Sequence, residues 1–165
     1  MSAQLIIESL NNMTKIHRSM VALAKQKTDI IKKGDIDSLQ NLLKEENKHI
    51  QVIKKFEASL IQETSSFLQK NGLAIDQPSL INAIEIATQS EKEALLKGKI
   101  DLENQIKELS MQNQLNQQLL EQSLQFINVS LDLLQPDIDS YNYDRADNGS
   151  QDNRQQNRSL FDSKA

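Results

Sequence analysis

The chain has no cysteine and no tryptophan, and it has only four glycines and two prolines among its 165 residues. Without cysteine it can form neither a disulfide nor a thiolate-based zinc site. Aromatic residues make up only 4% of the chain, whereas sheet sandwiches require more aromatic and β-branched residues and more turns. The composition therefore predicts an all-α protein whose core is built mainly from leucine and isoleucine.

An excess of positive charge is also missing, since the formal net charge is −4. Binding to a nucleic-acid backbone depends on clustered lysine and arginine, so we expect no nucleic-acid partner. No apolar run approaches the roughly 20 residues of a membrane span, and the N-terminal stretch lacks the basic lead and long apolar run of a secretory signal. We therefore expect a cytoplasmic protein with no direct membrane insertion.

Catalytic and metal-binding patterns are scarce. The two histidines, His17 and His49, fall on the apolar sides of two different predicted helices. A partly buried structural histidine is the preferred interpretation there, over a metal ligand or a proton-transfer group. Carboxylates such as Glu45 and Glu46 lie in ordinary charged helix surface, whereas acid–base catalysis requires a pocket. We therefore predict that the protein is not an enzyme and has no catalytic residue, metal site or cofactor.

Helix-breaking residues divide the sequence into three long segments. Gly34 ends the first segment, Asn71 and Gly72 end the second, and Pro78 opens a third that Pro136 closes. Apolar residues recur at spacings of three and four in each segment, which is typical of amphipathic helices. The pattern predicts helices over about residues 4–33, 36–70 and 78–135.

Capping signals support the first boundary. Lys32 and Lys33 place basic residues in the last turn of the first helix, and Gly34 can adopt the left-handed cap. Asp35 can then cap the second helix. Because this connection is so short, the first two helices should fold back on each other as an antiparallel hairpin.

The third segment has signals of its own. Asp76 or Gln77 can cap it, with Pro78 in its first turn. Ser90 followed by Glu93 resembles a capping box, so a kink or restart near residue 90 is consistent with the sequence. Residues 1–136 are thus predicted to form one elongated helical domain, a three-helix coiled-coil-like bundle made of the hairpin and a long C-terminal helix.

The last part of the chain, residues 137–165, is polar, carries both signs of charge and has few large apolar residues. Such a segment cannot bury enough apolar surface to offset the entropy lost on ordering. We therefore predict a flexible, disordered C-terminal tail.

The third predicted helix is rich in leucine but poor in charge. Between Asn104 and Asn128 the only charged residues are Lys107, Glu108 and Glu121. A projection at about 100° per residue gives two apolar stripes, although a helix in a simple three-helix bundle needs one. The first stripe comprises Leu102, Ile106, Leu109, Leu120, Leu124, Ile127, Leu131 and Leu134. The second comprises Met111, Leu115, Leu119, Phe126, Val129 and Leu133, with Ser123 and Ser130 between the stripes.

The second stripe can be explained in two ways. Leaving large apolar side chains in water forfeits roughly 1.5 to 3 kcal/mol each, so a lasting exposed stripe is either an interaction site or an aggregation hazard. The first two helices could bury the third helix on both sides. Alternatively, the stripe forms part of a groove that a partner, or a second copy of the chain, fills.

Two stretches carry a family resemblance. KGDIDSLQNLLKEENKHI, residues 33–50, contains a Gly-Asp turn before a helix rich in Leu and Glu, and NQLNQQLLEQSLQFINVSLDLL, residues 113–134, contains Asn-x-x-Leu-Leu and Leu-x-Phe patterns. Together they resemble the FlgN family of flagellar type III export chaperones, over about residues 1–143. That family commonly carries a Tyr-Gly pair near the end of this region. Here Tyr141 and Tyr143 are followed by Asn142 and Asp144 instead.

The resemblance implies a cytoplasmic helical chaperone. It implies binding to the C-terminal segments of hook-filament junction proteins, which are hook-associated proteins of the FlgK and FlgL type, before they assemble. It also implies delivery of this cargo to the export gate or ATPase complex of the flagellar type III apparatus. Tyr141 and Tyr143 are then the candidates for contact with that apparatus.

The stripes suggest where such cargo would bind. A spare apolar stripe can accept an amphipathic helix, and the surrounding Gln, Asn and Ser side chains would let it settle without desolvating ion pairs. The predicted substrate-binding residues are Leu115, Leu119, Ser123, Phe126, Val129, Ser130 and Leu133. The predicted inward set comprises Leu120, Leu124, Ile127, Leu131 and Leu134, although the two sets could be exchanged.

Other functions fit the same pattern. A structural coiled-coil homodimer or scaffold would also show apolar seams and a charge-poor strip, and a chaperone could cover its stripe by dimerising when it is free of cargo. A chaperone for the filament-cap protein or for flagellin is the related alternative.

Overall fold

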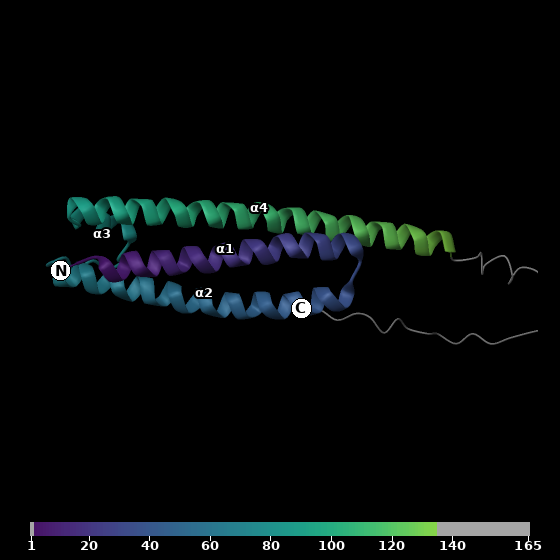
Figure 1. Cartoon of the computed structure of the whole chain (residues 1–165), viewed down its shortest axis with the longest axis horizontal. Coiled ribbons are helices and arrows are strands. Elements are labelled where there is room, and N and C mark those ends of the chain that lie inside the picture. The colour runs from purple at the N-terminus through teal and green to yellow at the C-terminus, as the bar shows by residue number, and fades with distance from the viewer. Residues whose placement is uncertain (1, 135–165) are drawn as a thin grey trace, which may run out of the picture. The chain divides into compact units, whose positions relative to one another are not determined.

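The computed structural model describes residues 2–134, which form four α-helices and no strand (Figure 1). The helices are α1 (Gln4–Lys33), α2 (Ile36–Lys70), α3 (Leu80–Ile86) and α4 (Gln89–Leu134). The all-α prediction is confirmed, whereas the tail predicted for residues 137–165 lies outside the described residues. The chain divides into two compact units, Met1–Phe126 and Ile127–Ala165. Helix packing is therefore described within the first unit.

α1 and α2 form the predicted antiparallel hairpin. Gly34 has φ 67°, and its N–H donates to the Ile31 carbonyl oxygen at 3.1 Å. This left-handed conformation suits glycine because it has no Cβ. Asp35 caps α2, since its Oδ1 accepts from the Ser38 N–H at 3.0 Å and its Oδ2 from the Ser38 hydroxyl at 2.6 Å. Both predicted caps are confirmed.

The third predicted helix is divided into α3 and α4. Its first turn begins later than expected, because Ser79, and not Asp76 or Gln77, caps α3 through a reciprocal capping box with Asn82. Ala87 then has an extended backbone, with ψ 154°, which interrupts the helical path. The restart near residue 90 therefore exists as a full break between two helices.

The capping box expected at Ser90 and Glu93 is wrong by two residues. Glu91 Oε2 instead accepts from the Thr88 N–H at 3.1 Å and from the Thr88 hydroxyl at 2.7 Å. Thr88 and Glu91 have the same three-residue spacing as the predicted pair. Thr88 directly precedes α4, and the Glu91 carboxylate reaches back to bond its N–H.

Glu91 also ties the beginning of α4 to the beginning of α1. Its Oε1 accepts from the Ala3 N–H at 2.8 Å, while the Thr88 contacts occupy Oε2. Hydrogen bonds to the ionised form lower a carboxyl pKa. The Thr88 hydroxyl bond, followed by the Ala3 and Thr88 N–H bonds, lowers the pKa of Glu91 from 4.5 to about 2.

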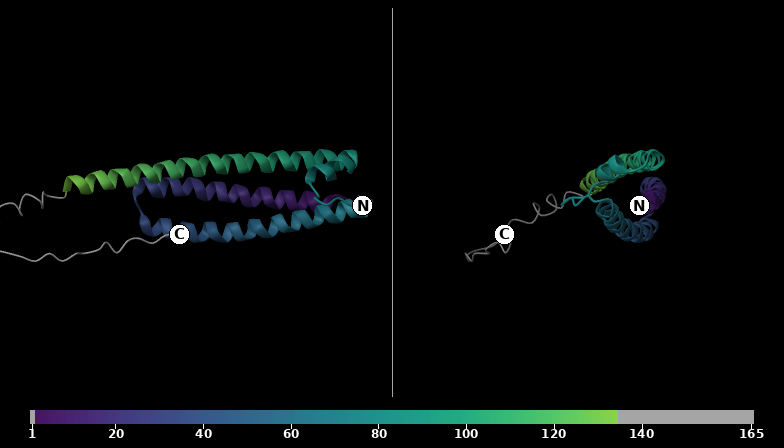
Figure 2. Two further views of the ribbon diagram at one scale, coloured as in Figure 1. Left: turned by 180° about the vertical axis from the view of Figure 1, so that it is seen from behind. Right: turned by 90° about the vertical axis from the view of Figure 1, so that its left-hand side faces the viewer.

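α4 runs parallel to α1 within the first unit. Ala3 contacts Glu91, Leu10 contacts Gly98, and Thr28 contacts Asn116, so the two helices run in the same direction. α2 lies on the other side of α1, and the view along the helices shows α2, α1 and residues 89–126 of α4 in an open arc with α1 in the middle (Figure 2).

The largest cluster of buried apolar residues lies where the start of α1 meets the end of α2, α3 and the start of α4. It comprises Ala3, Ile6, Leu10, Met13, Phe67, Ala83, Ile84, Leu95 and Leu102. Gly98 lies beside it, and a Cβ added there would be 3.2 Å from the Cβ and Cδ1 atoms of Leu10. Leu10 is fully buried, so it has little room to yield. The absence of a side chain at Gly98 thus sets how closely α4 approaches α1.

Replacing Gly98 with valine should lower the melting temperature. The added branches would collide with Leu10, and overpacking of this kind typically destabilises by about 1–3 kcal/mol. Thermal unfolding followed by circular dichroism would measure the loss. Lys97→Val is the matched control, because it places the same side chain on the exposed neighbouring position. A Gly98→Val melting temperature equal to that of the control would contradict the close approach.

Glu91→Gln should remove a pH-dependent part of the stability. Because the folded pKa of Glu91 is lowered from 4.5 to about 2, its stabilisation is fully present above about pH 4.5 and is lost as the pH falls toward 2. The wild type should melt roughly 2–4 °C above the variant at pH 7, as expected for one helix cap in a domain of this size. The difference should shrink between pH 4.5 and pH 2. Exposed Glu93→Gln is the control; a Glu91→Gln difference that stays constant with pH would overturn this role.

Candidate functional site

The face of α4 that packs on α1 changes from apolar to polar along the helix. Near its start it presents Leu95, Gly98 and Leu102, all buried. Further along, the same three-and-four spacing leads through half-buried Gln105, Leu109 and Gln112 to buried Asn116. Amides are thus interspersed with leucines in the second half of this interface, which the two-stripe projection did not reveal.

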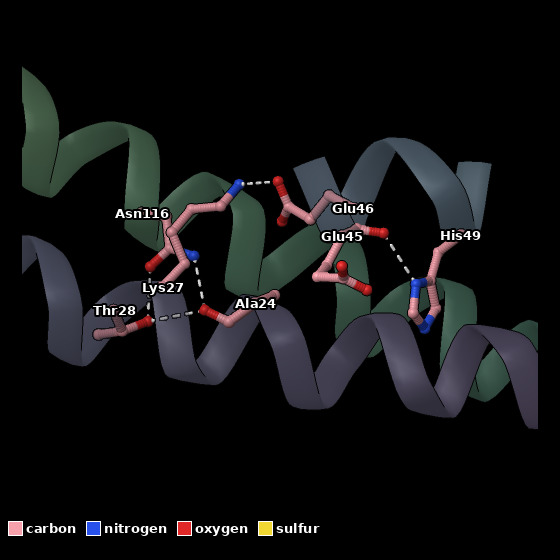
Figure 3. Close-up of polar contacts among 7 residues, drawn as sticks. All are labelled: Ala24, Lys27, Thr28, Glu45, Glu46, His49 and Asn116. Atoms are coloured by element: carbon pink, nitrogen blue, oxygen red, sulfur yellow. Dashed lines mark hydrogen bonds and ion pairs between the residues drawn. The ribbon is translucent and has the colours of Figure 1, made fainter. Parts of the chain in front are cut away.

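Asn116 is the centre of a buried polar cluster (Figure 3). Its Nδ2 donates to the Ala24 carbonyl oxygen at 2.8 Å, and its Oδ1 accepts from the Thr28 hydroxyl at 2.5 Å. The Thr28 oxygen in turn accepts from Gln112 Nε2 at 2.6 Å. Because a shift of α4 by one turn would break all three bonds, the cluster fixes the register of α4 on α1.

An ion pair between α1 and α2 lies next to this cluster (Figure 3). Lys27 Nζ is 2.7 Å from Glu46 Oε2, and both side chains are largely buried. Since a buried charge is stable only when it is paired, the two residues neutralise each other at this point. Lys27 lies between Ala24 and Ile31 at the three-and-four spacing of the buried face of α1, and the ion pair explains how a charge is tolerated there.

A cavity of about 270 Å³ opens beside the ion pair and the Asn116 cluster. All three long helices line it. Its lining residues are Met20 and Lys27 from α1, Glu46 and Ile50 from α2, and Asn113, Asn116, Gln117 and Leu120 from α4. Apart from the neutralised ion pair, the lining is uncharged. The arrangement suits an apolar or amide-bearing ligand and offers no anion or metal site.

α4 continues past the end of its neighbour. α1 ends at Lys33, only shortly after Thr28, whereas α4 runs on from Asn116 through Phe126. The side chain of Phe126 is 74% exposed. Leu124, at 60% exposed, and Phe126 are therefore largely uncovered within the first unit.

The predicted substrate-binding residues differ in accessibility. Leu115, Ser123 and Phe126 are exposed in the first unit, and Leu119 is half-buried. The Ser123 hydroxyl donates to the Leu119 carbonyl oxygen at 2.9 Å, a bond to the backbone one turn earlier in the same helix. In the second unit, Val129 and Leu133 are exposed and Ser130 is half-buried. Tyr141 and Tyr143 lie outside the described residues.

Within the first unit the predicted inward set is wrong, because Leu120 and Leu124 are exposed. Its other members, Ile127, Leu131 and Leu134, lie in the second unit and are exposed there. The error comes from the projection: an ideal helix drifts about 20° per heptad relative to a packed 3.5-residue seam, so over thirty-odd residues the stripes are displaced from the true interface. The observed interface with α1 runs from Leu102 through Asn116 to Leu119. It was not recognised in the sequence because several of its residues are polar.

Both histidines make contacts within the chain, and His49 is half-buried. His17 is buried, and its Nδ1 is 2.9 Å from the Met13 carbonyl oxygen. His49 lies on α2, where its Nδ1 is 2.9 Å from the Glu45 carbonyl oxygen and its Nε2 is 2.8 Å from the Ser19 hydroxyl. Within residues 2–134, no group of His, Asp and Glu side chains is arranged to hold a metal ion.

Membrane insertion can be judged from the helices themselves. Of α1 to α4, none combines the length and the apolar character that crossing a bilayer requires.

Comparison with known proteins identifies the family. The family model described as FlgN protein matches residues 1–150 of the chain. The chain belongs to the FlgN family. It is also 33% identical, over its whole length and the whole length of the relative, to an uncharacterized Bacillus subtilis protein, YvyG. No solved structure matches it.

FlgN membership establishes the general role. This FlgN-family protein is a flagellar export chaperone, and the family is cytoplasmic and non-enzymatic. The family also implies binding to hook-associated proteins of the FlgK and FlgL type. The resemblance seen in residues 33–50 and 113–134 is therefore confirmed.

Asn116→Asp should weaken the docking of α4 on α1 in this FlgN chaperone. The substitution replaces the donor that bonds the Ala24 carbonyl with an oxygen, and it buries an unpaired charge, which typically costs at least about 1–3 kcal/mol. Thermal unfolding should show the loss at pH 7 and partial recovery at acidic pH, where the new carboxyl is protonated. Asn113→Asp is the matched control, because Asn113 is exposed; equal effects of the two variants would contradict a fixing role for the cluster.

Proposed function

We propose that this FlgN chaperone binds the C-terminal segments of hook-filament junction proteins through the exposed apolar face of α4, prevents their premature assembly and delivers them to the export apparatus. The observation that carries the proposal is the exposure of Leu115 and Phe126 on a stretch of helix with few charges. Soluble proteins rarely leave large apolar patches uncovered unless they bind something.

Helix-in-groove packing is the physical basis of the proposed binding. An amphipathic segment that assembles only after export exposes its apolar side before then, and that side would aggregate. α4 offers it apolar side chains set among amides and hydroxyls, such as Gln118 and Ser123. Because few ion pairs need to be desolvated, release at the export apparatus would face no large electrostatic barrier.

The residues proposed for cargo contact are the ones predicted from the sequence. They are Leu115, Leu119, Ser123, Phe126, Val129, Ser130 and Leu133. The structure suggests that they do not contribute equally: Leu119 is half-buried and also supports the seam with α1, whereas Leu115 and Phe126 are free to meet a ligand. Tyr141 and Tyr143 are proposed to contact the export gate or the ATPase complex.

Replacing Leu115 and Phe126 together with aspartate should weaken cargo binding at least about tenfold. Each lost apolar contact is worth roughly 1.5 kcal/mol or more, and about 1.4 kcal/mol corresponds to tenfold in affinity. Isothermal titration calorimetry with C-terminal fragments of the hook-associated proteins from the same bacterium would measure the change. Fragments of the filament-cap protein and flagellin test the related chaperone functions.

The matched control is Leu5→Asp with Val52→Asp, which makes the same chemical change at two exposed apolar positions of α1 and α2. Circular dichroism should show that all variants remain helical. Unchanged binding by the Leu115 and Phe126 variant would contradict the proposed cargo-binding face. If the wild type binds none of the fragments and is a stable dimer by light scattering, the structural-homodimer alternative is favoured.

A further inference from the structure

The cavity beside the Asn116 cluster lies on the other side of α4 from Leu115 and Phe126. Steps of about 100° per residue place Leu120 on one flank of the α1-facing seam and Leu115 on the opposite flank. Leu120 lines the cavity and Leu115 does not. The cavity is therefore separate from the face proposed above for cargo binding.

The two walls of the cavity carry matching apolar side chains. Ile50 of α2 is 37% exposed and Leu120 of α4 is 38% exposed, and both line the cavity. Leu43 precedes Ile50 by one heptad on α2 and is also exposed, so it continues the same line. Within the described residues, α2 and α4 are joined by no hydrogen bond or ion pair. Each packs on α1 (Figure 2), and the cavity of about 270 Å³ lies between them.

We propose that this cavity, between α2 and α4 with α1 as its floor, is a second cargo contact that takes an uncharged amphipathic helix. Three helices around one unfilled cavity, with Met20, Ile50 and Leu120 as its apolar lining, have the geometry of a four-helix bundle that lacks a member. A helix seated there would cover Ile50 and Leu120 and lie against Met20, which is buried at the floor of the cavity. This inference rests on the proposed function, because it requires that the chaperone binds an amphipathic segment.

The charge of the lining selects the occupant. Lys27 and Glu46 already neutralise each other at 2.7 Å, and the other lining residues carry no charge. A charged ligand would have to be desolvated without gaining an opposite charge. An apolar helix face carries no charge to desolvate. The amides of Asn113 and Gln117 at the rim can form hydrogen bonds with the polar edges of such a helix. The complementary partner is thus a helix whose buried face is apolar and uncharged.

Binding of cargo on both sides of α4 would have a structural consequence. A guest helix in the cavity would bridge α2 and α4 at this point, where each of them packs on α1. It would also shield the Lys27–Glu46 pair and the Asn116 cluster from water, which strengthens electrostatic interactions. Cargo binding at this site should therefore stabilise the docking of the second half of α4, where the interface with α1 is polar.

Site-specific photo-cross-linking would test the proposal. Benzoylphenylalanine would be placed in the full chain at position 50, 120, 126 or 52, and each protein mixed with C-terminal fragments of the hook-associated proteins from the same bacterium. Val52 is the matched control, because it is 36% exposed on the flank of α2 opposite Ile50. We expect cross-links to the fragment from positions 50 and 120 and none above background from position 52.

A binding measurement complements the cross-linking. Ile50→Asp combined with Leu120→Asp should lower the affinity for the fragment at least tenfold, whereas Val52→Asp should leave it unchanged. Circular dichroism would show whether the variants remain folded. If the double variant is unfolded, the cross-links from the otherwise unsubstituted chain decide the question.

The possible failures can be told apart. A complex that forms and cross-links from position 126 but not from position 50 overturns the cavity as a cargo site and leaves the proposed function standing. Absence of any complex with the wild-type chain overturns both. Cross-links from position 50 to a second copy of the chain, with a dimer by light scattering, show that the chain itself fills the cavity and overturn the proposal as well.

Discussion

The docking of α4 along α1 is the constraint on which the rest of the structure depends. Near the start, Glu91 accepts from the Ala3 N–H and Gly98 admits Leu10, so the helices approach closely. Further along, Asn116 bonds Thr28 and fixes the register with polar groups. An apolar contact gains stability from any close packing, whereas hydrogen bonds between particular groups exist in only one register. The first half of the interface thus supplies stability and the second half supplies position.

α1 serves two neighbours at once, and this explains the exposed surface. Its buried residues surround enough of the helix to meet α2 on one side and α4 on the other, and they include polar Thr28 and His17. Because α2 and α4 both pack on α1, neither covers the side chains of the other that border the cavity. Ile50 on α2 and Leu120 on α4 are consequently left over one-third exposed around a cavity. An export chaperone has a use for such surfaces, since an unpartnered apolar flank is what an amphipathic cargo segment requires.

Much of the architecture could be predicted from local signals. Gly34 and Asp35 predicted the hairpin, because a left-handed glycine and a side-chain cap depend only on residues close by in the chain. The break before α4 was placed near residue 90, but the cap was assigned to Ser90 and Glu93 when Thr88 and Glu91 form it. Both pairs have the same spacing, and only the extended conformation of Ala87 decides between them. The candidate site was predicted to lie on α4, yet the cavity walls on α2 were not foreseen.

The sequence by itself determined the helices, their caps, the all-α class and the family, because each depends on residue type and short-range spacing. Which side of α4 faces α1 was decided only in the tertiary structure. Two apolar stripes of similar strength gave no basis for choice, and the actual seam includes Gly98, Gln112 and Asn116, which look unsuited to a core. Those residues become favourable only when Leu10 and Thr28 lie opposite them. Such pairing joins positions more than eighty residues apart, and no local pattern records it.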